Sequence, residues 1–127
     1  RQRQMCIETE INENFIRCSF FELCSRYLSS CYTFAIEQNN SAGRSNFEMT
    51  GIPGTDYYKD DRLAEFKYFK AKEAERMLAL SDPRPEDVAQ VLAYAKDTKV
   101  KFPHYHVRSY IVYICANKGW KCWEVTP

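Results

Sequence analysis

The sequence of 127 residues has no apolar run that approaches the ~20 residues needed for a membrane-spanning helix. We therefore expect no integral membrane association. The formal net charge is only +1, so the molecule as a whole has no electrostatic drive to bind nucleic acid or an anionic membrane surface. Nucleic acid is accordingly not an expected partner.

The usual signatures of hydrolases and nucleotide-binding proteins are also missing. There is no Gly-x-Ser-x-Gly elbow, no glycine-rich phosphate loop and no His-Glu-x-x-His pair. His104 and His106 are two positions apart, a spacing at which side chains on a helix face different directions. Adjacent Asp60 and Asp61 are interpreted as charges near the start of a helix rather than as a catalytic pair. The sequence thus predicts no enzyme, no catalytic residue, no metal ligand and no cofactor.

What the sequence does contain is an even number of cysteines, unevenly distributed. In a small chain this is typical of disulfides formed in an oxidising compartment. The absence of an initiator methionine and of an apolar leader is interpreted as a mature secreted protein that has lost its signal peptide. Close Cys-x-x-Cys pairs, which structural zinc sites prefer, are absent. We expect a secreted, extracellular protein with three disulfides among Cys6, Cys18, Cys24, Cys31, Cys115 and Cys122.

The spacing of the N-terminal cysteines limits their pairing. Residues six or seven apart on a continuous helix are separated by ~9–10 Å along its axis, whereas a disulfide needs Cα atoms within ~7 Å. Cys18, Cys24 and Cys31 therefore cannot pair with one another on an unbroken helix. The two C-terminal cysteines can serve only two of the N-terminal four, so at least one bond lies within residues 6–31. We expect Cys6 to pair with Cys18 or Cys24, with the other two reaching the C-terminal pair; a break in the first helix is the alternative.

Apolar residues recur at intervals of three and four along most of the chain, the pattern of amphipathic helices. A strand over residues 111–114 is rejected because no partner strand is evident. The prediction is an all-α fold: a compact single domain, residues 1–127, of about four to five helices cross-linked by three disulfides. The expected elements are a helix over residues 7–35, a loop over 39–55, a helix over 55–81, a short helix over 86–95 and a helix from Pro103 to a stop at Gly119.

Two segments have local features of their own. Asn39 opens an Asn-x-Ser glycosylation sequon, which is compatible with secretion. Residues 96–121 carry an excess of Lys and Arg. We interpret this excess as a solvated helical face rather than a polyanion-binding patch, because no aromatic residues interleave with it as they do in nucleic-acid platforms.

Aromatic residues make up 15% of the chain, and Tyr and Trp are enriched at interface hot spots because they bury area with little loss of rotamer entropy. Packing in a helical core is the alternative explanation for many of them, and the apolar residues of the predicted loop are interpreted as a lid over that core. The candidate binding surface comprises Phe47, Met49, Tyr57, Tyr58, Tyr68, Tyr105, Trp120 and Trp123.

A small, disulfide-tied, aromatic-rich helical protein without a catalytic motif resembles the salivary effectors of blood-feeding arthropods. Within that group the chain is most similar to the anophensin and albicin family of anopheline mosquito saliva, in size, helical pattern and cysteine use. The resemblance implies an all-helical fold that inhibits host plasma cascades, the alternative complement pathway convertase first and the contact system second. The implied partner is a host plasma protein complex.

Two other classes of function remain open from the sequence. The helices could enclose a small hydrophobic ligand, as in odorant-binding proteins, although the Cys-x-x-x-Cys step of that class is missing. A saposin-like membrane-active module is the second alternative, although its close cysteine pairs near each end are also missing. Bound lipid would identify the first class and liposome leakage the second.

Overall fold

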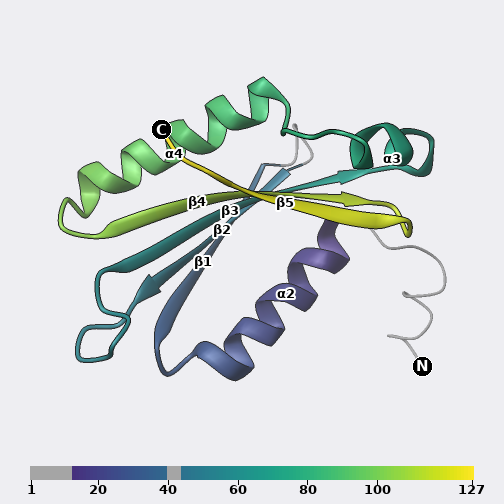
Figure 1. The fold of residues 1–127 in the computed structure, drawn as a ribbon. Coiled ribbons are helices and arrows are strands. Elements are labelled where there is room, and N and C mark those ends of the chain that lie inside the picture. The colour runs from purple at the N-terminus through teal and green to yellow at the C-terminus, as the bar shows by residue number, and fades with distance from the viewer. Residues whose placement is uncertain (1–12, 40–43) are drawn as a thin grey trace.

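The computed structural model describes residues 13–39 and 44–127. Over these residues the chain forms an α/β fold in which three helices cover a mixed five-stranded sheet (Figure 1). In chain order the elements are α2 (Glu13–Leu28), β1 (Tyr32–Asn39), β2 (Arg44–Gly51), β3 (Asp60–Phe69), α3 (Ala71–Leu78), α4 (Pro85–Lys101), β4 (His106–Cys115) and β5 (Gly119–Val125).

The strands lie in the order β1-β2-β3-β4-β5. Every neighbouring pair is antiparallel except β3 and β4, which run parallel. A parallel pair needs a long crossover connection, and α3 with α4 provides it. Both crossover helices lie on one face of the sheet, and α2 lies on the other (Figure 1).

Side chains of β3 alternate between these two faces, as strand geometry requires. Phe69 belongs to the core beneath α3 and α4, and Phe66 belongs to the core beneath α2. Asp61, Glu65 and Lys67 share the parity of Phe69 and therefore face the crossover helices. This alternation places charged side chains of β3 on the α3 and α4 face of the sheet.

Each face has its own hydrophobic core. The α3 and α4 side is built on Phe69, Ala74, Met77, Val91, Ile111, Tyr113 and Cys115. The α2 side is built on Cys24, Phe47 and Phe66, with Phe20 packed edge-on against Phe47 at a centroid distance of 4.9 Å. The sheet is therefore the middle layer between two separate cores.

The predicted all-α fold is wrong. The expected helix over residues 55–81 is strand β3 followed by the shorter helix α3, and the expected loop over 39–55 contains strand β2. The expected C-terminal helix is strand β4, and Gly119 opens β5 instead of ending a helix. The helix expected over residues 7–35 is confirmed in part as α2, but its end is strand β1, and the third predicted helix is confirmed as the longer α4.

The predicted cross-links are also wrong for the cysteines whose side chains the structure describes. Cys24, Cys31, Cys115 and Cys122 are free thiols. Cys24 lies in the α2 core and Cys115 in the core on the opposite face of the sheet, so the sheet itself separates them. Cys6 and the side chain of Cys18 fall outside the described part of the chain. None of the helices in the described part of the chain is long and apolar enough to cross a membrane.

Candidate functional site

Strands β2 and β3 place several charged side chains together on the face covered by α3 and α4. In the β2–β3 register Glu48 pairs with Leu63, so Glu48 lies between Asp61 and Glu65 on the neighbouring strand. Asp61 is 0% exposed and Glu65 is 3% exposed. Carboxylates are almost never buried to this degree unless they are paired, hydrogen-bonded or bound to an ion. We refer to Glu48, Asp61, Glu65 and Lys67 as the carboxylate site.

The electrostatics of Asp61 are strongly perturbed. Burial and a hydrogen bond with Glu48 raise the pKa of Asp61 to about 8. The Oγ1 hydroxyl of Thr50 donates to Asp61 Oδ2 at 3.1 Å, whereas the buried Oδ1 has no hydrogen-bond partner among the described residues. Two carboxyl groups in contact share a proton, and a bound cation can take the place of that proton.

The position opposite Glu65 on β2 holds an amide. Asn46 is the register partner of Glu65 and is half-buried. Within the described part of the chain, no three or more His, Cys, Asp or Glu side chains are grouped closely enough to hold a metal ion. The carboxylates therefore form a contacting pair, Glu48 with Asp61, and a separate position where Glu65 lies opposite Asn46.

A buried network lies beside Lys67. The β4 residue that pairs with Lys67 is Tyr113. Tyr113 is fully buried, and its hydroxyl donates to Asp87 in the first turn of α4. The Arg84 backbone N–H donates to Tyr113 Oη at 3.0 Å, and Arg84 Nε donates to Asp87 Oδ2 at 3.1 Å. Burial and the bond to Asp87 raise the pKa of Tyr113 to about 12, so the hydroxyl keeps its proton. This network fixes the start of α4 over the sheet next to the carboxylate site.

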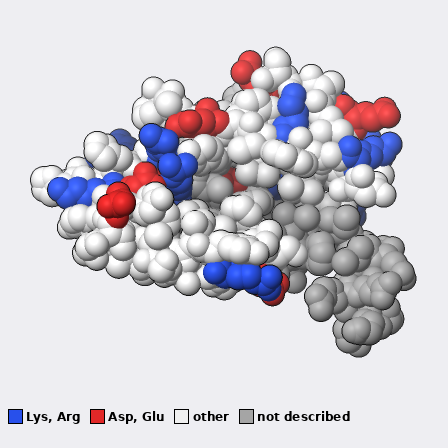
Figure 2. All heavy atoms as spheres, turned by 60° about the horizontal axis from the view of Figure 1, so that its bottom comes forward, with Lys and Arg blue, Asp and Glu red and all other residues white. Residues whose placement is uncertain are grey.

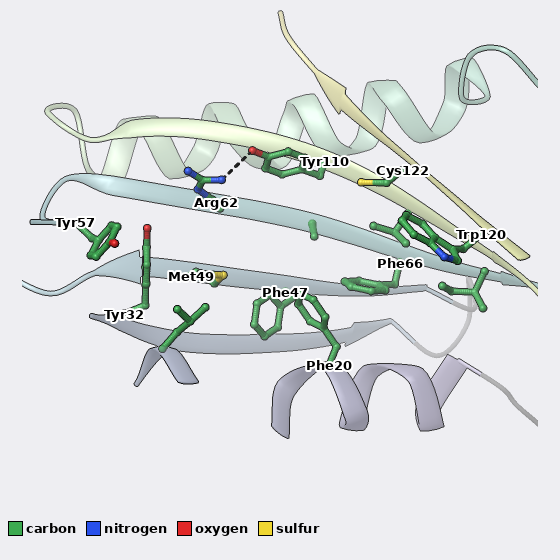
Figure 3. A pocket seen from close by; sticks show the side chains of 14 residues that line it. Phe20, Tyr32, Phe47, Met49, Tyr57, Arg62, Phe66, Tyr110, Trp120 and Cys122 are labelled. Atoms are coloured by element: carbon green, nitrogen blue, oxygen red, sulfur yellow. Dashed lines mark hydrogen bonds between the residues drawn. The ribbon is translucent and has the colours of Figure 1, made fainter. Parts of the chain in front are cut away.

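Four of the eight residues in the predicted binding surface come together, but on the other face of the sheet. Phe47, Met49, Tyr57 and Trp120 line a pocket of about 650 Å³ between α2 and the β3–β5 part of the sheet (Figure 3). At its Tyr57 end, Arg62 Nη1 donates to Tyr110 Oη at 3.2 Å. That this pocket binds a partner stays a prediction.

The other four predicted residues are scattered. Tyr58 and Tyr105 contact each other at a centroid distance of 5.9 Å, at the ends of the loops that lead into β3 and β4. Trp123 packs against Tyr113 at 5.1 Å, and Tyr68 is half-buried on β3. They do not form one surface with the pocket residues.

The α2 side of the molecule shows no dominant charge. In the space-filling view, Lys and Arg lie interspersed with Asp and Glu, among large areas of uncharged surface (Figure 2). A polyanion is attracted by a basic surface, so this view gives no reason to place one there. The chemistry of the protein is better sought on the opposite face, at the carboxylate site.

Sequence reasoning missed the carboxylate site because it treated residues 55–81 as one helix. On a helix, residues 65 and 67 face different directions, but on a strand they share a face. The Asp60–Asp61 pair is not a helix cap, since both residues open strand β3 and only Asp61 faces the carboxylate site. The signal that could have revealed the site is the alternation of Asp61, Glu65 and Lys67 at even spacing.

A family model described as the PD-(D/E)XK nuclease superfamily matches residues 11–124. No curated protein and no solved structure matches the chain. The second half of the motif in that description, an acidic residue, any residue and lysine, is present as Glu65-Phe66-Lys67 on β3. The sequence contains no Pro-Asp dipeptide for the first half, and the acidic residue that β2 supplies on the same face is Glu48.

Proposed function

Because the chain belongs to the PD-(D/E)XK nuclease superfamily, we propose that it hydrolyses phosphodiester bonds in nucleic acid at the carboxylate site. The observation that carries the proposal is the Glu65-Phe66-Lys67 motif, whose Glu65 and Lys67 lie on the same face of the sheet as the buried Asp61 and the half-buried Glu48. Buried carboxylates next to a lysine are the groups that position a phosphate and a cation.

Several expectations from the sequence are thereby corrected. The resemblance to the anophensin and albicin family is wrong, because it depended on a helical pattern and disulfides that the described residues do not have. Inhibition of a host plasma protein complex is wrong as the function, and so are the carrier and saposin-like alternatives. The predictions of no enzymatic activity and no nucleic-acid partner are contradicted by the superfamily match, which covers nearly the whole chain.

The residues present fit a hard divalent cation such as Mg²⁺, which prefers oxygen ligands. Oδ1 of Asp61 is buried without a donor, and Glu48 and Glu65 supply further carboxylate oxygens on the same face. Glu48, which lies between Asp61 and Glu65, would hold the ion together with a neighbouring carboxylate of β3. When bound, such an ion supplies Lewis-acid chemistry at a phosphoryl oxygen.

Lys67 has a separate role in this proposal. Its ammonium group is a compact positive charge two residues from Glu65 and on the same face. A fixed cation in a half-buried site stabilises the negative charge that develops on the phosphate in the transition state. Lys67 therefore contributes to the rate, and the carboxylates contribute to holding the ion.

The test is cleavage of a supercoiled plasmid and of a single-stranded oligonucleotide with Mg²⁺ or Mn²⁺ and with EDTA. We expect cleavage that needs the cation and that falls by about two orders of magnitude or more in Glu65→Gln. The matched control is Glu75→Gln, because Glu75 is an exposed residue of α3 whose side chain is 87% exposed. Equal cleavage by Glu65→Gln and the control would refute the proposal.

A further inference from the structure

The pocket on the α2 face of the sheet is long, and its walls are mostly apolar (Figure 3). Among the described residues that line it, Arg62 is the one charged side chain, and it lies at the opposite end from Trp120. Trp120 pairs with Ile114, which is six residues beyond Arg108, the partner of Arg62. At ~3.3 Å per strand residue, the two ends are therefore about 20 Å apart. Apolar side chains of α2, β2, β3 and β4 form the walls between them.

Two arginines face each other at the charged end. Arg62 and Arg108 are directly opposite on β3 and β4. Each is four residues before a side chain of the α2 core, Phe66 or Val112, so both share the α2 face. Like charges in this arrangement are destabilising. Asp60 offsets one of them, because it accepts a bond from Arg62 Nε at 3.0 Å and interacts electrostatically with Arg108. The three side chains together carry one net positive charge.

Tyrosine hydroxyls fix the position of these charges. Tyr32 Oη donates to Asp60 Oδ2 at 2.5 Å, and Arg62 Nη1 donates to Tyr110 Oη at 3.2 Å. Tyr57 packs against Tyr32 at a centroid distance of 5.3 Å. A guanidinium group has five N–H donors, and the bonds to Asp60 and Tyr110 use two of them. Because the Arg62 side chain is 39% exposed, its guanidinium can also donate to a ligand that enters the pocket.

These features fit a molecule with an apolar body and one anionic head. Ligand pockets are typically ~300–1,000 Å³ and apolar, with a few polar groups that fix the orientation of the ligand. The pocket of about 650 Å³ has this composition. A carboxylate matches the fork of a guanidinium group, and one net positive charge suits a single carboxylate better than a polyanion. A fully extended chain advances ~1.2 Å per bond, so a chain of up to about 16 carbons fits along the pocket.

We propose that this pocket binds an amphipathic carboxylic acid, with the carboxylate at Arg62 and Arg108 and the apolar chain extending toward Trp120. The pocket and the carboxylate site lie on opposite faces of the sheet, so this inference does not rest on the proposed function. The ligand lies against the sheet of the nuclease fold, and its anionic head determines its orientation. It is therefore a different site from the cavity of the helical carrier considered from the sequence.

The experiment titrates decanoate into the full chain by isothermal titration calorimetry, below the concentration at which decanoate forms micelles. We expect saturable binding of one molecule per chain, and at least about tenfold weaker binding of 1-decanol, which has the same chain without the charge. Arg62→Gln should weaken decanoate binding at least about tenfold. The matched control is Arg76→Gln on α3, where the side chain is 70% exposed, and it should bind as the wild type does. No saturable binding by the wild type, or equal affinities of the two variants, would overturn the inference.

A second variant tests the head group without removing the bond between Arg62 and Asp60. Arg108→Gln changes an exposed residue of β4, and we expect it to lower the affinity for decanoate several-fold and to leave the affinity for 1-decanol unchanged. An equal effect on the acid and the alcohol would show that Arg108 does not recognise the carboxylate, and would overturn the inference. Circular dichroism of each variant establishes that it is folded before binding is measured.

Trp120 reports where the apolar chain lies. The sequence has two tryptophans. Trp120 is 67% exposed at the pocket, whereas Trp123 packs on the core of the opposite face. Bound decanoate should move the tryptophan emission to shorter wavelength, because the chain displaces water from Trp120. The shift should be lost in Trp120→Phe and kept in Trp123→Phe. A shift that depends on Trp123 instead, or no shift on saturation with decanoate, would contradict the placement of the chain and overturn the inference.

Discussion

At the scale of single residues, Asp61 combines complete burial with a carboxyl neighbour, and the result is a pKa raised to about 8 from the usual 3.8. A raised pKa means that the folded protein binds this proton more tightly than the unfolded chain does. Without a divalent cation, the stabilisation from protonated Asp61 is complete below about pH 4 and is lost as the pH rises through about 8.

This linkage predicts the effect of Asp61→Asn, which keeps the shape but cannot ionise. Relative to the wild type, the variant should gain ~1 kcal/mol or more in free energy of unfolding at pH 8 in EDTA, and much less at pH 5. Urea unfolding at the two pH values measures the difference. A gain of the same size at both values would contradict the assignment of the raised pKa.

The residues of the carboxylate site were present in the sequence, but their grouping was not visible in it. Asp61, Glu65 and Lys67 share a face only because residues 60–69 form a strand. The pairing of Glu48 and Asn46 with that strand depends on a register across an irregular connection, which no local pattern encodes. By contrast, the aromatic side chains flagged from composition fell on both faces of the sheet, because composition carries no direction.

At the scale of the elements, helix α4 was predicted well because its start is marked locally. Pro85 stands at its first position, and Glu86 and Asp87 supply acidic charge in the first turn. Strand β4 was mistaken for a helix because it carries apolar side chains on both faces, one packed beneath α3 and α4 and the other lining the pocket. Apolar side chains then occupy successive positions, such as Tyr110 and Ile111, instead of every second position. The sequence therefore lacks the alternation of apolar and polar residues that identifies a strand.

The parallel pairing of β3 with β4 is likewise hidden in the sequence. Register partners such as Lys67 and Tyr113 lie far apart in the chain and are brought together only by the α3–α4 crossover. Rejecting a strand over residues 111–114 for want of a partner was therefore wrong. The strands that pair with this segment are β3 and β5. Helices cover β3, and β5 is the last strand of the sequence, so the strand pattern of each is weak.

The junction between α4 and β4 gives a stability prediction. Tyr113→Phe removes a fully buried hydroxyl that donates to Asp87 and accepts from the Arg84 backbone. Leaving these buried groups without that partner should cost about 1–3 kcal/mol of unfolding free energy, measured by urea denaturation. Tyr58→Phe, at a tyrosine that is 45% exposed, is the control and should change stability by no more than ~0.5 kcal/mol. Equal losses in the two variants would contradict a structural role for the network.

At the scale of the whole molecule, a sheet separates two cores, and the described cysteines are distributed between them as free thiols. The even cysteine count suggested that disulfides stabilise the fold. Among the described residues, packing on both faces of the sheet stabilises it instead. Secretion, which was inferred from the same cysteines, stays a prediction. The two faces also divide the functions considered for the protein, with the carboxylate site on one and the apolar pocket on the other.

Free thiols give a prediction for the molecule as a whole. Dithiothreitol should leave the midpoint of thermal unfolding unchanged within about 1 °C, because a native disulfide in a small domain typically contributes ~2–5 kcal/mol and none joins the described cysteines. Thiol titration in denaturant without reductant should detect at least the four cysteines Cys24, Cys31, Cys115 and Cys122. A large fall in the midpoint on reduction would contradict this state of the cysteines.

The most direct test of the carboxylate site is to locate a cation on it. Crystals grown with Mn²⁺ should give an anomalous difference peak between β2 and β3 on the α4 side of the sheet, with carboxylate oxygens of the carboxylate site as its ligands. Glu65→Gln crystals grown in the same way should show that peak weakened or lost. An occupied peak elsewhere on the molecule, with none at the carboxylate site in the wild type, would contradict the assignment of this face as the site of cation-dependent cleavage.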